Sequence, residues 1–131
     1  TGSGYQAAVL GEIVREVYSI EIIETLARKS SELLNKLGYK NIHVKHGDGY
    51  QGWKEAAPFD AILITAAAPK IPEPLLHQLK MEGRLVMPLG KSRAPQELIA
   101  LTKTENGLKK RVVEIVAFVP MTGEVRNSGL K

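Results

Sequence analysis

The sequence of 131 residues contains no cysteine, and aromatic residues make up only 5% of it. Without cysteine the chain has no disulfide framework, no thiolate metal site and no cysteine nucleophile. Its apolar runs are all far shorter than the roughly 20 residues that a membrane-spanning helix needs. Its three histidines, at positions 43, 46 and 77, lack the spacing of metal ligands. We therefore expect neither a membrane partner nor a bound metal.

The composition is that of a globular protein, with 44% hydrophobic and 24% charged residues. The length predicts one domain over residues 1–131. The net charge is +4, but the basic residues are scattered and only Lys109, Lys110 and Arg111 are contiguous. This pattern favours a solvated surface over a nucleic-acid face. The absence of cysteine is compatible with a reducing compartment, and we expect a cytoplasmic protein. We also expect a monomer.

Helix and strand patterns alternate along the chain. Apolar spacing predicts helices over residues 6–14, 22–38 and 72–79, and strands over 17–21, 42–46, 60–65 and 84–88, with a turn at 80–83. Two further strands, over 96–104 and 108–120, are joined at Asn106-Gly107, which is typical of a hairpin turn. Strands separated by helices pair in parallel. The fold class expected is therefore α/β, a doubly wound, mostly parallel sheet with an antiparallel C-terminal hairpin.

The carboxyl ends of the predicted strands carry a candidate nucleoside site, because ligands of such sheets bind there. The opening turn contains Gly2 and Gly4, which let the backbone approach a ligand closely. Glu21 lies 19 positions after Gly2 and suits a carboxylate that binds a ribose diol. Asp48, followed by Gly49, ends another strand, where it could accept from a base amine. Each feature alone also has a plain structural explanation, but their order at three strand ends favours a nucleoside.

Two nucleoside cofactors fit these features. A nicotinamide dinucleotide requires a similar glycine-rich turn and acid, with its pyrophosphate at the helix N-terminus. S-adenosylmethionine has no phosphate, and the acidic turn at 47–49 suits its adenine. The closing hairpin also favours S-adenosylmethionine, because too few residues remain for a second mononucleotide half.

Longer motifs resemble one family. The stretches "TGSGYQAAVL", "HGDGYQGW", "TAAAPKIPEPLLHQLK", "GRLVMPLG" and "AFVPMTGE" closely resemble protein-L-isoaspartate O-methyltransferases in order and spacing, over essentially the whole chain. The resemblance implies a class I methyltransferase fold and transfer of a methyl group from S-adenosylmethionine to the free carboxylate of isoaspartyl residues in damaged proteins. It assigns cofactor binding to Gly2, Ser3, Gly4, Glu21, Asp48, Gly49 and Thr122. It places Thr65, Ala66, Ala67, Ala68 and Pro69 beside the transferred methyl, as substrate-binding residues.

The chain departs from this family before Thr1. The family has a helical N-terminal segment with a Ser- or Thr-bearing loop, followed by the first strand of the sheet. The 131 residues contain neither. We therefore expect a partial domain that lacks this strand and is inactive alone, and we assign no catalytic residue because the family's lies in that loop.

The chemistry itself requires no catalytic triad. A carboxylate is already nucleophilic at neutral pH and a sulfonium methyl is already electrophilic, so positioning and desolvation must do most of the work. Two alternatives remain open: another class I methyltransferase acting on a small molecule or RNA, and an inactive cofactor-binding fragment. Tyr50 and Trp53 either border a substrate groove or pack in the core.

Overall fold

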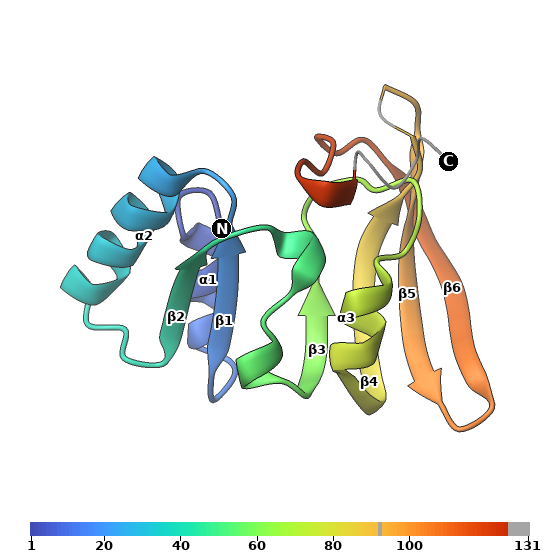
Figure 1. The fold of residues 1–131 in the computed structure, drawn as a ribbon, viewed down its shortest axis with the longest axis horizontal. Coiled ribbons are helices and arrows are strands. Elements are labelled where there is room, and N and C mark those ends of the chain that lie inside the picture. Colours follow the sequence, from blue (N-terminus) through green and yellow to red (C-terminus); the bar gives the residue numbers. More distant parts are fainter. Residues whose placement is uncertain (92, 126–131) are drawn as a thin grey trace. The chain divides into compact units, whose positions relative to one another are not determined.

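The computed structural model describes residues 1–91 and 93–125 and consists of two compact units, Thr1–Gly49 and Tyr50–Lys131 (Figure 1). Each unit has its own sheet and its own apolar cluster. The units are therefore described one at a time. The expectation of a single partial methyltransferase domain stays a prediction.

The first unit contains α1 (Tyr5–Gly11), β1 (Val17–Glu21), α2 (Glu24–Lys36) and β2 (Ile42–His46). The two strands pair in parallel, from Val17 opposite Ile42 to Glu21 opposite His46. The buried residues of α2, Ala27, Ser30 and Leu34, recur at helical spacing and face the interior. Ala7, Val17, Leu34 and Ile42 form the small core. This packing places the end of β1 beside the start of α2.

The second unit contains two short 3-10 turns and a four-stranded sheet. After η1 (Gly49–Gln51) and η2 (Lys54–Ala56) come β3 (Phe59–Leu63), α3 (Glu73–Gln78), β4 (Leu79–Leu89), β5 (Gln96–Thr104) and β6 (Gly107–Val116). The strand order is β3-β4-β5-β6, with β3 and β4 parallel and the remaining neighbours antiparallel. The core is formed by residues from α3 and the central strands, among them Leu79, Leu85, Met87, Ile99 and Leu101.

The elements predicted from the sequence are present, but several boundaries differ. The strands over 17–21, 42–46 and 96–104 have the predicted limits. The first helix is predicted to reach residue 14 and instead ends at Gly11, and the strand after Pro58 ends at Leu63 rather than at residue 65. The last strand ends at Val116 rather than at residue 120, because Gln96 then binds the backbone of Phe118.

The predicted turn at 80–83 falls within the bounds of β4, where the ladder with β3 passes from Leu79 to Arg84. These residues lie inside β4, which begins at Leu79 directly after α3. Glu82 has a φ of 62° and the β3–β4 register shifts between Phe59 and Ala61, so the glycine-containing stretch forms an irregularity in the strand. A glycine next to charged residues indicates a turn as much as a bulge, so the sequence does not separate the two.

Candidate functional site

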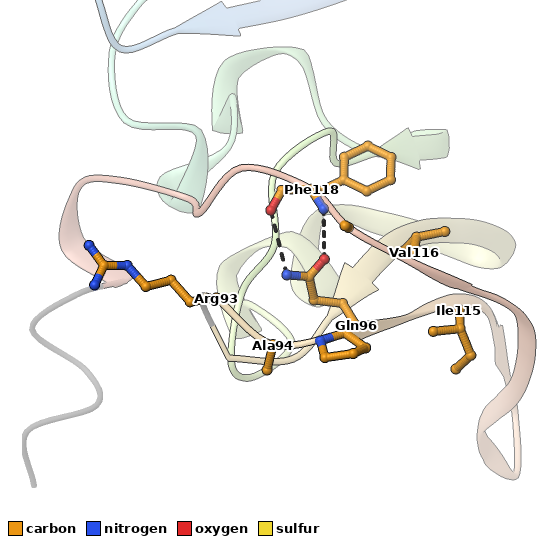
Figure 2. Close-up of a pocket in the computed structure, with 8 residues that line it drawn as sticks. Arg93, Ala94, Gln96, Ile115, Val116 and Phe118 are labelled. Atoms are coloured by element: carbon orange, nitrogen blue, oxygen red, sulfur yellow. Dashed lines mark hydrogen bonds between the residues drawn. The ribbon is translucent and has the colours of Figure 1, made fainter.

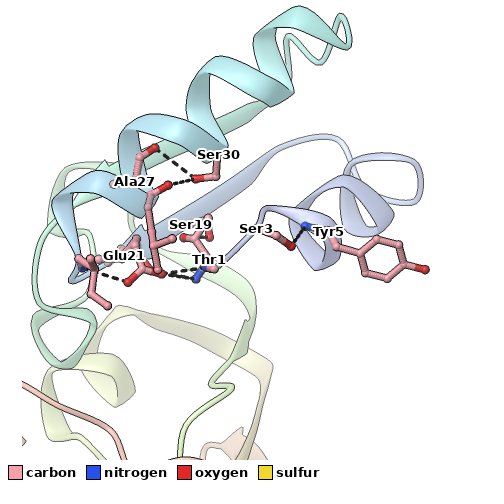
Figure 3. Close-up of polar contacts among 11 residues, drawn as sticks. Thr1, Ser3, Tyr5, Ser19, Glu21, Ala27 and Ser30 are labelled. Carbon is pink, nitrogen blue, oxygen red and sulfur yellow. Dashed lines mark hydrogen bonds and ion pairs between the residues drawn. The ribbon is translucent and has the colours of Figure 1, made fainter.

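The opening turn is held by the carboxylate of Glu21. The Gly2 N–H donates to Glu21 Oε2 over 2.8 Å, and the Ile23 N–H donates to Glu21 Oε1 over 3.0 Å (Figure 3). The α-amino group of Thr1 lies 3.4 Å from Glu21 Oε2, and the Thr1 hydroxyl is 2.6 Å from that of Ser19. The structure thus brings together Gly2 and Glu21, two residues that the sequence assigns to one cofactor site.

Gly4 fixes the start of α1 against α2. It is the N-cap of α1 with a φ of 87°, and its N–H donates to the carbonyl of Thr1 over 3.0 Å. A Cβ at this position would lie 3.3 Å from Leu34 Cδ1 and 3.4 Å from Ser30 Cβ. The backbone conformation favours glycine here, and a Cβ would be in tight contact with Leu34. Ser3, between the two glycines, is exposed and accepts a long hydrogen bond from the Tyr5 N–H.

Glu21 is ionised and keeps acceptor capacity. Its side chain is nearly buried, with 10% of its surface exposed. Burial raises its pKa, but hydrogen bonds from the Gly2 and Ile23 N–H groups lower the pKa below its ordinary value overall. A carboxylate offers about four lone pairs. The two backbone hydrogen bonds use one on each oxygen, and Oε2 also faces the Thr1 nitrogen, so Oε1 keeps capacity for a further donor such as a hydroxyl group.

The turn after β2 lies beside the end of β1. The Gly47 N–H donates to the backbone carbonyl of Glu21 over 2.9 Å. Asp48 and Gly49, the residues predicted to face the adenine, follow directly and are half-buried. Within the first unit, the opening turn and the turn after β2 are therefore both hydrogen-bonded to Glu21, through Gly2 and Gly47.

The remaining predicted residues come together in the second unit. Ala67 and Ala68 are buried, whereas Thr65 and Pro69 are exposed and Ala66 is half-buried. The Ala67 N–H donates to Val119 O and the Met121 N–H donates to Ala67 O, each over 2.8 Å. The segment 65–69 thus pairs with the segment that leads into Thr122. Both segments hold residues that the resemblance assigns to ligand binding.

A buried glutamine that sequence analysis missed organises the loop after η1. Gln78, 6% exposed at the end of α3, donates through Nε2 to the Gln51 carbonyl and accepts through Oε1 from the Trp53 N–H, each over 2.8 Å. Gln51 in turn donates through its side chain to Glu124 Oε2. The available signal was a polar residue on the otherwise apolar face of a predicted helix. Tyr50 packs against the core of the unit, in agreement with the packing alternative.

A second buried glutamine holds the chain after β6. Gln96 Oε1 accepts from the Phe118 N–H over 2.7 Å, and Gln96 Nε2 donates to the Phe118 carbonyl over 3.5 Å (Figure 2). An open cavity of about 530 Å³ lies here, lined by residues 93–96 and 115–118. Gln96 thereby sets where the chain turns toward Val119 and Ala67.

The described part of the chain offers no metal centre and no membrane helix. Among residues 1–91 and 93–125, no group of three or more histidine, aspartate or glutamate residues could hold a metal ion. No helix among them is long and apolar enough to cross a bilayer. His77 is exposed, and the His43 side chain, 43% exposed, lies 2.8 Å from Glu16.

Solved structures place this fold among the class I S-adenosylmethionine-dependent methyltransferases. A solved protein-L-isoaspartate O-methyltransferase superposes with a TM-score of 0.90 at 29% identity, covering 98% of this chain and 44% of that one. A Plasmodium falciparum structure described as a methyltransferase of the same kind, in complex with S-adenosyl-L-homocysteine, has a TM-score of 0.69 at 27% identity. The match covers 91% of this chain and 58% of the Plasmodium falciparum chain.

The sequence comparison is more specific than the fold. The model of the protein-L-isoaspartate(D-aspartate) O-methyltransferase family matches residues 1–126, and the chain belongs to this family. Protein-L-isoaspartate O-methyltransferase 2 of Syntrophobacter fumaroxidans is 57% identical over 124 residues, which are 94% of this chain and 50% of that protein. The Nitrosococcus oceani protein of the same name is 56% identical over 125 residues. These residues are 95% of this chain and 57% of that protein. The chain thus spans about half the length of these relatives.

Proposed function

We propose that the protein transfers a methyl group from S-adenosylmethionine to the free carboxylate of isoaspartyl residues, as a repair enzyme for damaged proteins. The observation that carries this proposal is the family match over residues 1–126. The relatives that match over more than nine tenths of this chain bear the name of that activity. We further propose that the enzyme acts as a cytoplasmic monomer whose domain extends over residues 1–131 and is part of a larger methyltransferase domain.

The cofactor is proposed to lie along the turn that Glu21 organises. Gly2, Ser3 and Gly4 would present backbone to its methionine group, Glu21 would accept from the ribose hydroxyls, and Asp48 with Gly49 would face the adenine. The resemblance also assigns cofactor binding to Thr122, in the second unit. The support is the hydrogen bonding of Gly2 and Gly47 to Glu21, which gathers the turn and both strand ends of the first unit. The Plasmodium falciparum relative, solved in complex with S-adenosyl-L-homocysteine, supports the choice of cofactor.

The substrate is proposed to lie on Thr65, Ala66, Ala67, Ala68 and Pro69. The buried alanines are fixed by backbone hydrogen bonds to residues 119–121, and Thr65 and Pro69 are exposed beside them. Neither the ionised carboxylate nor the sulfonium methyl requires further activation. The reaction therefore needs only that the two groups are held in line. These residues therefore serve to position the peptide and to exclude water.

A methyl-transfer assay tests the proposal directly. The protein, at its natural length, is incubated with labelled S-adenosylmethionine and with paired peptides that differ only in an isoaspartyl or an aspartyl residue. We expect label to appear in the isoaspartyl peptide alone, as a base-labile methyl ester. Equal labelling of both peptides, or labelling of RNA or a small molecule instead, would assign the protein to another methyltransferase activity.

A further inference from the structure

The cavity beside Gln96 presents an apolar surface. It has a volume of about 530 Å³ and is lined by residues 93–96 and 115–118. Pockets of about 300–1,000 Å³ with mostly apolar walls are typical of ligand sites. Gln96 is 2% exposed, and both ends of its amide are bound to the backbone of Phe118 (Figure 2). Arg93 is the only charged residue that lines the cavity in the described part of the chain. The cavity therefore suits an apolar group.

Two large apolar side chains of this lining remain exposed. Ile115 is 59% exposed and Phe118 is 37% exposed. Exposed apolar surface that is gathered around one hollow, rather than scattered singly, is typical of an interaction site. An apolar side chain of a ligand would remove this surface from water, which is favourable.

The walls of the cavity continue from the proposed substrate-binding segment, within the same unit. The Ala67 N–H donates to the Val119 carbonyl over 2.8 Å, and the Gly90 N–H donates to the Ala68 carbonyl over 2.9 Å. Phe118, at the end of one wall, directly precedes Val119, and the other wall begins three residues after Gly90. The two chains that hold the proposed substrate-binding segment therefore lead into the two walls of the cavity.

We propose that the cavity binds an apolar side chain of the substrate polypeptide, a few residues away from the isoaspartyl residue. The inference rests on the proposed function, because it takes segment 65–69 as the place of the isoaspartyl residue. An extended chain advances about 3.3 Å per residue, so a peptide that follows either wall from this segment reaches the cavity after about two to four residues. The enzyme then prefers damaged sites with a large apolar residue at that distance.

Pairs of isoaspartyl peptides test this preference. The two peptides of a pair carry leucine or serine at one position, which lies two, three or four residues before or after the isoaspartyl residue. Methyl transfer is measured with the protein at its natural length. At one of these positions we expect the KM of the leucine peptide to be about tenfold lower, because burial of a leucine side chain contributes to binding. The kcat values should agree within about twofold, since the cavity holds no reacting group.

Three variants locate the source of the preference. Ala94→Trp fills the cavity and Ile115→Asp places a charge in it, so each should bring the KM values of the leucine and serine peptides together. Val113→Asp is the matched control, because Val113 is 45% exposed on the same strand and is not among the residues that line the cavity in the described chain. This variant should keep a difference of about tenfold. Thermal unfolding checks that each variant is folded.

The outcomes distinguish this inference from the proposed function. If isoaspartyl peptides are methylated but leucine and serine give equal KM values at every position, the role of the cavity is overturned while the proposed function stands. A preference for leucine that survives in both Ala94→Trp and Ile115→Asp would also overturn it, because the preference would then arise elsewhere. If no isoaspartyl peptide is methylated, the proposed function is wrong and this inference falls with it.

Discussion

Gly2 and Glu21, nineteen residues apart in sequence, are joined by a hydrogen bond of 2.8 Å from backbone N–H to carboxylate. The other oxygen of the same carboxylate accepts from Ile23, one residue before α2 begins. One side chain therefore fixes both the turn before α1 and the start of α2. The proposed cofactor turn depends on the ionisation of Glu21.

Replacing Glu21 by glutamine should destabilise the protein in a pH-dependent way. The folded pKa of Glu21 is depressed, so its stabilising contribution is present above the pKa of an unfolded glutamate, about 4.3, and is lost as the pH falls through the lower folded pKa. At about pH 7 the free energy of unfolding of the variant should be about 1–3 kcal/mol lower than that of the wild type, because one backbone N–H loses its acceptor. Urea unfolding at several pH values measures this difference.

The control for this prediction is Glu32→Gln. Glu32 forms an ion pair with Arg28 on the surface of α2, with both side chains more than 60% exposed. Such pairs contribute about 0–1 kcal/mol. A stability difference for Glu21→Gln that stays constant from neutral to acidic pH would contradict the prediction.

The proposed cofactor site predicts a shared effect of two acids. Glu21→Ala and Asp48→Ala should each weaken the binding of S-adenosylhomocysteine by about tenfold or more, since each removes a charged acceptor of ligand hydrogen bonds. Titration calorimetry measures the dissociation constants. Asp60→Ala is the matched control, because the Asp60 side chain is 89% exposed and pairs only with Lys80 among the ion pairs of the described residues. If both acid variants retained wild-type affinity, the assignment of the site would be wrong.

Gly4→Ala should destabilise the protein more than Gly38→Ala does. Both glycines have a positive φ, 87° and 89°, so both substitutions incur similar backbone strain of about 1 kcal/mol. A Cβ at Gly38 meets nothing within 4 Å, whereas one at Gly4 meets Leu34 and Ser30. Thermal and urea unfolding of the two variants isolates the packing of the turn against α2. Equal losses would show that only the backbone conformation matters.

Lys103→Met should lower stability although a lysine side chain is usually exposed. Lys103 Nζ donates to the carbonyls of Leu76 and Leu79, each over 2.9 Å, and so satisfies the carboxyl end of α3. We expect a loss of about 1–3 kcal/mol in urea unfolding. Lys80→Met, at an exposed surface ion pair, should change stability by less than about 0.5 kcal/mol. Equal effects of the two substitutions would contradict the role given to Lys103.

The contact between Gly52 and Gln78 predicts a non-additive pair of substitutions. Gly52→Ala alone should be strongly destabilising, because its Cβ would lie 2.2 Å from Gln78 Oε1. In Gln78→Ala the space is open, and adding Gly52→Ala should then cost only the strain of the positive φ. A double-mutant cycle measured by urea unfolding should show an interaction of about 1 kcal/mol or more. Additive losses would mean that the loop moves away from α3 freely.

Regular elements could be predicted because their side chains repeat with the period of the structure. The apolar positions of β1, β2 and β5 alternate or run together, and the sequence predicts the bounds of these strands. The turn expected at 80–83 illustrates the limit. Glu82 adopts a positive φ within β4, and only the pairing of β3 with Leu79 and Arg84 on either side places it inside a strand.

The proximity of some candidate residues could be predicted from backbone motifs, while their role in binding stays a prediction. Gly2, Glu21 and the 47–49 turn form one cluster, as their places at strand ends indicate. The role of Gln78 could not be predicted, because its partners at 51 and 53 are backbone groups and carry no side-chain signature. A sequence pattern shows which side chain is polar, but the tertiary fold determines which backbone it meets.

The outer strand β6 carries exposed charged and apolar side chains next to one another. All but the last of its residues are exposed, and within the described chain it pairs with β5 alone. Lys109, Lys110 and Arg111 lie on this free edge, so a second copy aligning its own β6 there would bring cation against cation. We expect this repulsion to disfavour such pairing at low ionic strength. Added salt shortens the Debye length to about 3 Å at 1 M and exposes the apolar Val112, Val113 and Ile115 to one another, so solubility should fall as salt rises.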